Sequence, residues 1–222
     1  MPSASLGAFP GSNDTSCTDE GAGLDENEHT SESVLMATLA PLQPSLWRTC
    51  RTIANRTRLK MFGLLLEEPG QTVSAVAQRL HQPLSLTSEY LRALEARGLL
   101  MARRIGRQVQ YRPNPAPNGG PASGLVPALR KTYQRATHPV DTIFRLATAF
   151  THPRRIEVFR ALQRGPRTVD QIQAVTRISG WALWRHLRKL EDRGFVISRH
   201  GIYALVHRPD DLGRQLARLA SE

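Results

Sequence analysis

An internal repeat limits most strongly what this chain can fold into. Three sequence blocks occur twice and in the same order. They are residues 58–62 and 155–159, residues 72–73 and 168–169, and residues 91–99 and 187–195. The offset between the copies is 97, then 96, then 96 residues. Because chance does not readily place three blocks in one order at nearly constant spacing, the sequence indicates a duplicated domain.

The first copy has apolar spacing typical of helices followed by a β-hairpin. Residues 46–53 and 59–66 repeat with helical periodicity, and a third helix is expected to begin at Thr72. A fourth helix carries a buried stripe and ends at Gly98, a residue suited to a left-handed cap. Residues 99–104 and 108–112 then alternate apolar and polar side chains, which predicts a hairpin.

The second copy repeats this order of elements. Thr168 and Gln171 predict a capping box, and Ser179 is expected to cap the helix that ends at Gly194. A shorter hairpin is expected to turn at residues 200–201. The predicted fold class is mainly α with small β-hairpin wings, as tandem winged helix-turn-helix domains.

Composition adds the boundaries of these domains. Residues 1–33 are rich in small polar and acidic residues and predict a disordered acidic tail, and a Pro/Gly-rich stretch predicts a linker. The expected order is the tail 1–33, a first winged domain 34–112, the linker 113–124, a connecting amphipathic helix 125–137 and a second winged domain with a C-terminal helix 138–222.

The charge of the chain favours a polyanionic partner. The sequence has 30 Lys and Arg residues against 19 Asp and Glu residues, a net charge of +11. Residues 1–45 hold seven of the acidic residues and none of the basic ones, so the folded part is more basic than the whole. No apolar run approaches the roughly 20 residues that span a bilayer, so we expect a cytoplasmic, nucleoid-associated protein without a membrane partner.

A short helix, a turn and a second helix predict a DNA-reading unit whose second helix enters the major groove of double-stranded DNA. The hairpin of copy one adds guanidinium groups that suit phosphate contacts, although charges on a strand edge can also simply discourage aggregation. The outward positions of the helix in copy one and the hairpin arginines are the expected DNA contacts of this copy: Ser85, Ser88, Glu89, Arg92, Arg103, Arg104, Arg107 and Arg112.

Residues 47–112 resemble the ArsR family of winged-helix regulators. The resemblance rests on residues 54–59, 72–74, 91–100 and 104–111, and residues 142–206 resemble the same fold more distantly. It implies a regulator that binds operator DNA as a two-fold assembly, and we expect this regulator to act as a repressor. Glu89 departs from the pattern, because the family usually has a basic residue there. It either accepts a hydrogen bond from cytosine or weakens DNA binding by this copy.

The outward face of the corresponding helix in copy two combines Trp181, Trp184, Arg185 and Arg188. The two arginines are expected to contact DNA. Exposed aromatic pairs mark protein interfaces more often than base contacts, so Trp181 and Trp184 are expected to pack against protein, either the first unit or a partner chain.

Each winged unit is followed by an amphipathic helix. The apolar faces of these helices hold Leu125, Leu129 and Tyr133 after the first unit and Leu212, Leu216 and Leu219 after the second. In ArsR-like proteins such a helix builds the dimer interface, and packing onto its own domain is an equal alternative. The copies could therefore pair within one chain as a pseudo-dimer, or two chains could form a homodimer.

Metal and cofactor chemistry finds no support in the motifs. The helix before the turn has no cysteine, and the seven histidines form no HxxxH pair, so no metal or other cofactor is expected. Phosphate-loop, dinucleotide and nucleophile-elbow motifs are missing, which argues against an enzyme. The alternatives to a transcriptional regulator are a tandem winged-helix protein of chromosome organisation or replication that acts through protein contacts, and an RNA-binding protein.

Overall fold

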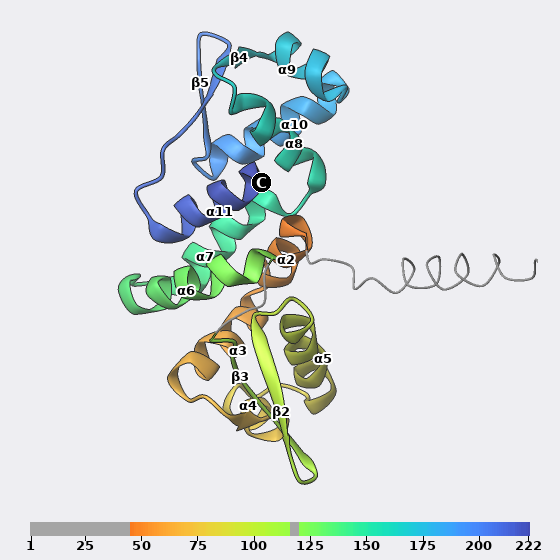
Figure 1. Cartoon of the computed structure of the whole chain (residues 1–222), viewed down its shortest axis with the longest axis vertical. Coiled ribbons are helices and arrows are strands. Elements are labelled where there is room, and N and C mark those ends of the chain that lie inside the picture. The colour runs from red at the N-terminus through yellow and green to blue at the C-terminus, as the bar shows by residue number, and fades with distance from the viewer. Residues whose placement is uncertain (1–44, 116–119) are drawn as a thin grey trace, which may run out of the picture. The chain divides into compact units, whose positions relative to one another are not determined.

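Each copy of the repeat folds into helices and one small sheet in a computed structural model that describes residues 45–115 and 120–222 (Figure 1). The expectations for the acidic tail 1–33, for residues 34–44 and for residues 116–119 of the linker lie outside the described residues. All described residues belong to one compact unit, and the tandem winged fold class is confirmed.

Copy one follows the expected order of elements. Two helices come first, a helix-turn-helix follows, and a hairpin and a long helix complete the copy. The elements are α2 (Leu46–Ile53), α3 (Arg56–Glu67), β1 (Gln71–Thr72), α4 (Val73–Arg79), α5 (Leu84–Glu95), β2 (Leu100–Ile105), β3 (Gln108–Pro113) and α6 (Gly120–Arg135).

Copy two has the same order, with a short 3₁₀ turn extending its first helix. The elements are α7 (Pro139–Ala147), η1 (Thr148–Phe150), α8 (Pro153–Leu162), β4 (Arg167–Thr168), α9 (Val169–Thr176), α10 (Gly180–Asp192), β5 (Val196–Arg199), β6 (Ile202–Leu205) and α11 (Asp211–Ser221). Every element of copy one therefore has a counterpart in copy two.

Each hairpin is part of a three-stranded antiparallel sheet. The strand orders are β1-β3-β2 and β4-β6-β5, with two-residue strands β1 and β4 at one edge. The sequence pattern does not predict these short strands. Thr72 and Thr168 each end a strand and also cap the next helix, and a two-residue strand is too short to show an alternating pattern.

Local capping signals are mostly confirmed. Gly98 and Gly194 follow the recognition helices with φ values of 70° and 72°, a left-handed backbone that favours glycine. The Thr168–Gln171 capping box forms, with the Thr168 amide donating to Gln171 Oε1 at 3.0 Å. Ser179 occupies the N-cap position of α10, as expected. Its hydroxyl, however, accepts no capping hydrogen bond.

The helix after the first wing is longer at its start than expected. Helix α6 begins at Gly120 and ends at Arg135. It therefore starts within the expected linker 113–124, and it ends before the end of the expected connecting helix 125–137. Pro121 follows the first helical residue, where a missing amide proton costs nothing, and the helix continues through Pro127. Because this stretch is rich in Pro and Gly, the sequence pattern did not predict that a helix begins there.

The two copies share one core. Buried side chains from both copies form a single apolar cluster, and the counterpart helices contact each other, α6 against α11 and α2 against α7. The apolar residues that were expected at an interface lie in this packing: Leu125, Leu129, Leu212 and Leu216 are fully buried, Leu219 is buried and Tyr133 is half-buried. Within the chain, the terminal helices pack both on their own copy and across to the other.

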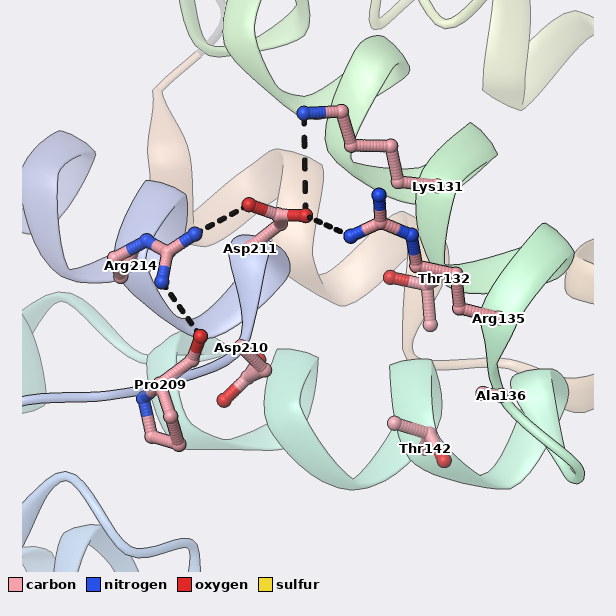
Figure 2. Close-up of a pocket in the computed structure, with 9 residues that line it drawn as sticks. All are labelled: Lys131, Thr132, Arg135, Ala136, Thr142, Pro209, Asp210, Asp211 and Arg214. Carbon is pink, nitrogen blue, oxygen red and sulfur yellow. Dashed lines mark hydrogen bonds and ion pairs between the residues drawn. The ribbon is translucent and has the colours of Figure 1, made fainter.

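Charged groups join α6 to the start of α11. Asp211 lies between Lys131 and Arg135 of α6 and Arg214 of its own helix (Figure 2). Its Oδ2 atom is 3.9 Å from Lys131 Nζ and 3.3 Å from Arg135 Nη1. A carboxylate in the first turn of a helix is also favoured by the helix dipole, so Asp211 stabilises both α11 and its contact with α6.

A tyrosine fixes α6 on the core of copy one. The Tyr133 hydroxyl donates to the Leu59 carbonyl oxygen at 2.6 Å, and its ring lies 6.2 Å from the Phe62 ring. Burial raises the pKa of Tyr133 above its usual value, with Glu67 contributing. The ring also passes so close to Gly63 that a Cβ added there would lie 2.6 Å from Tyr133 Cε1.

We predict that Gly63→Ala destabilises the protein, although alanine ordinarily strengthens a helix. The anchored Tyr133 ring leaves no room for the methyl group, so the expected loss is about 1–3 kcal/mol in the free energy of unfolding. Chemical denaturation measures it. The matched control is Gly180→Ala in α10, where the added Cβ would meet its nearest atom at 3.9 Å and stability should stay the same or rise. Equal stability of the two variants would contradict the tight Tyr133 contact.

Candidate nucleic-acid interface

The helix-turn-helix of copy one presents a polar face on α5. Thr87, Leu91 and Leu94 are fully buried, which turns the opposite side of α5 outward. The four residues expected on this side are Ser85, Glu89 and Arg92, which are exposed, and Ser88, which is half-buried. Arg92 Nη2 donates to Ser88 Oγ at 3.0 Å, so the guanidinium group is held along the helix.

The wing of copy one extends from the sheet as the β2–β3 hairpin (Figure 1). This hairpin carries four exposed arginines. Strand register divides them, because partners across an antiparallel pair share a face. Arg103 pairs with Gln110 and Arg112 with Met101, which puts both arginines on one face. Arg104 pairs with Val109 and belongs to the opposite face, and Arg107 lies in the turn beside Gly106.

Charge on this wing is not neutralised by the rest of the described chain. Arg103, Arg104, Arg107 and Arg112 make no ion pair with any described residue, and the hairpin has no acidic residue. Guanidinium groups on both faces and at the tip suit contact with a backbone that passes the hairpin on either side. The arrangement can bind phosphates without reading sequence.

Helix α10 of copy two presents a different face. Leu183, Leu187 and Leu190 are buried, while Trp181 is 70% and Trp184 42% exposed. The two indole rings stack at 5.2 Å with an interplanar angle of 15°. The guanidinium carbon of Arg188 lies 5.2 Å from the centre of the Trp184 ring.

The structure therefore does not bury Trp181 and Trp184 against the first unit, which was one form of the expectation for them. The buried leucines occupy the side of α10 that faces the core. The tryptophans lie on the other side of the helix and point away from the core. Arg185 and Arg188 are exposed on the same helix, as expected for groups that reach a partner.

The second wing is shorter and less basic than the first. Its turn lies at His200 and Gly201, both with left-handed φ, as the sequence predicts. Arg199 is its one arginine, and Ile197 and Ile202 are exposed. The basic charge thus lies mainly on the wing in copy one and on the recognition helix in copy two.

Metal-binding groups, the thiol of Cys50 and membrane-spanning helices were the other features to consider. Residues 45–115 and 120–222 contain no group of three or more His, Cys, Asp or Glu side chains able to hold a metal ion. Cys50 is fully buried, and this burial raises the pKa of its thiol far above the usual value. Among the described helices, none is long and apolar enough to cross a membrane.

Comparison with protein families matches both copies. A family model of bacterial regulatory proteins of the ArsR family matches residues 152–198, and a model of winged helix-turn-helix DNA-binding domains matches residues 55–101. The chain contains two winged helix-turn-helix domains. The resemblance to the ArsR family is confirmed, but the two copies are matched in the reverse of the expected way. The ArsR model matches the second winged domain, which was expected to be the more distant copy, and the more general model matches the first. The first model describes bacterial regulatory proteins and the second describes DNA-binding domains.

No curated protein matches the sequence. The crystal structure of human N-acetylserotonin methyltransferase in complex with SAM is similar over 78% of this chain and 45% of that chain, with 16% identity and a TM-score of 0.30. This chain spans less than half of that protein's length.

We predict that Arg104→Ala combined with Arg107→Ala weakens binding to every duplex alike. Each lost phosphate contact should lower the slope of log K against log salt by about one unit. Fluorescence anisotropy with several unrelated duplexes at a series of salt concentrations measures both effects. Arg164→Ala is the matched control, because this exposed arginine follows α8 and lies outside both wings. An unchanged salt slope in the wing variant would remove this wing from the interface.

Proposed function

We propose that this protein is a transcriptional repressor whose two winged domains bind one DNA duplex as an intramolecular pseudo-dimer. The observation that carries the proposal is the pairing of counterpart helices, α2 with α7 and α6 with α11. Such pairing is what a two-fold dimer interface produces, in which the same surface is used by both partners. It leaves the outward faces of α5 and α10 exposed. Occupation of a promoter would then block transcription.

The two domains divide the work differently. In copy one, Ser85, Ser88, Glu89 and Arg92 face the bases, while Arg103, Arg104, Arg107 and Arg112 of the wing hold the backbone. In copy two, Arg185 and Arg188 supply the contacts to base edges, since a guanidinium group can bind guanine in a bidentate manner. Because the two outward faces differ in sequence, the operator should have two unequal halves.

The acidic residues of the segment 1–33 would compete with DNA for the basic domains. Binding requires no cofactor or metal and no catalytic step. The protein would act in the cytoplasm, associated with the nucleoid.

Mapping where the protein binds in cells and which sequences it selects tests this proposal. We predict discrete promoter peaks in genome-wide immunoprecipitation, with a shared site of two unequal halves whose centres are about one helical turn apart. Transcripts from the bound promoters should rise when the gene is deleted. Broad or absent enrichment would contradict a role in regulation.

Equivalent arginines in the two copies provide a matched pair of variants. Arg92 and Arg188 occupy the same repeat position, 96 residues apart. In selection from random duplexes, Arg92→Ala should relax one half of the site and Arg188→Ala the other, each by about 1–3 kcal/mol of discrimination. Relaxation of the same half by both variants would contradict the assignment of one domain to each half.

A second candidate function is docking onto a protein partner through copy two. The stacked and exposed Trp181–Trp184 pair favours it, because large aromatic residues are enriched in protein interfaces. In this case the protein would organise an assembly on DNA, as tandem winged domains of chromosome organisation do, and a second copy of the chain is the simplest partner.

The double variant Trp181→Ala and Trp184→Ala separates the two functions. Both side chains are exposed, so the melting temperature should change little. If the tryptophans face DNA, the variant loses specific DNA affinity. In this case the sedimentation coefficients of the wild-type protein and of the variant do not depend on protein concentration. If the wild-type protein associates with concentration and the variant does not, the pair is a docking surface. A large loss of stability would contradict the exposure seen in the structure.

A further inference from the structure

A basic pocket beside the recognition helix of copy two shares only Arg185 with the contacts described above. It opens between the start of α8, the turn from α9 to α10 and the first turns of α10. Its volume is about 460 Å³, within the range of small-ligand sites. Four arginines and two histidines line it together with small and apolar groups, and no acidic residue does: His152, Arg154, Arg155, Arg177, Arg185 and His186.

The positive charge in this pocket is poorly compensated. Arg154 has a partner in Glu157 at 3.1 Å, but within the described part of the chain Arg177 and Arg185 have no ion pair. Arg155 donates to the Thr151 hydroxyl, and its Nε atom is buried without a hydrogen-bond partner among the described residues. Burial and the nearby Arg193 lower the pKa of Arg155. A buried unpaired donor is costly, so a ligand that accepts its hydrogen bond would stabilise the site.

Two stacked histidines form one wall of the pocket. The His152 and His186 rings are 4.9 Å apart with an interplanar angle of 37°. His152 Nδ1 accepts from the Arg154 amide at 3.1 Å, so in the neutral ring the proton is on Nε2, which is free to donate. Burial, His152 and the arginines Arg155, Arg185 and Arg154 lower the pKa of His186 to about 4.

We propose that this pocket binds a phosphate group. Guanidinium forks from three elements, a neutral imidazole donor and the unengaged Ser179 hydroxyl converge on one cavity without a carboxylate, which is the donor set that a tetrahedral oxyanion requires. The first amides of α10 add partial positive charge on the same side. The phosphate can come from a soluble phosphorylated compound or from the DNA backbone.

Titration of the full chain with inorganic phosphate, at constant ionic strength and without DNA, tests the site. The variant Arg177→Asn is the best probe, because Arg177 is exposed and follows α9 as its C-cap with φ 54°, a left-handed backbone that asparagine tolerates. We expect the dissociation constant measured by calorimetry to rise about tenfold in Arg177→Asn. Arg199→Asn on the second wing, an exposed arginine outside the pocket, should bind phosphate like the wild-type protein.

The histidines provide an independent readout. A bound dianion favours the imidazolium form, so the pKa of His186 should rise from about 4. Because the pKa is higher in the complex, binding should tighten as pH falls through the pKa of the complex and should level off below about 4. Histidine NMR signals followed with sulfate, which keeps its charge across this range, separate this effect from the titration of phosphate itself.

DNA binding identifies the source of the phosphate. If the backbone occupies the pocket, saturating phosphate weakens DNA binding by the wild-type protein and not by Arg177→Asn. If a soluble compound is the ligand, phosphate binds with the same affinity whether or not DNA is present. Equal phosphate binding by wild-type protein and Arg177→Asn, with an unmoved His186 pKa, would overturn the proposal. The titration without DNA shows whether the pocket binds phosphate even if the protein proves not to be a repressor.

Discussion

The apolar contact between α6 and α11 determines how the two winged domains are joined. Leu125 and Leu129 of α6 and Leu212 and Leu216 of α11 are fully buried, and burying a leucine side chain contributes about 1.5–3 kcal/mol. The ion pairs of Asp211 are partly exposed, and such pairs contribute about 0–1 kcal/mol each. Leucine burial therefore supplies most of the stability of this contact, and the ion pairs of Asp211 add to it. The separation of α5 from α10 depends on this packing.

Much of the fold could be predicted because it rests on signals with a local cause. A left-handed cap needs glycine, which is why Gly98 and Gly194 mark the ends of both recognition helices. The leucine stripes on α5 and α10 follow from helical periodicity, and they also define which residues face outward. Short strands β1 and β4 and the start of α6 were missed, since their stability comes from pairing and packing with distant residues rather than from their own sequence.

The candidate sites show the same limit. The wing arginines could be found from the sequence because they are close together along the chain, although only strand register separates Arg103 from Arg104. The pocket of copy two could not be found this way. His152 and His186 are 34 positions apart, and only the packing of α8 against α10 brings their rings together. A basic cluster assembled from several elements leaves no motif in the sequence.

Electrostatics distinguishes the two basic regions of the molecule. The wing arginines are exposed, so water and salt screen their interactions over a Debye length of about 8 Å at physiological ionic strength. Arg155 and His186 are partly buried, and burial lowers the pKa of both by penalising their charged forms. An anion that reaches them is less screened and removes an existing penalty. The exposed wing is therefore suited to a mobile, sequence-independent hold on a polyanion, while the pocket is suited to one phosphate at a fixed position beside α10. Duplication within a single chain permits this division, because each domain can change its surface without altering the other.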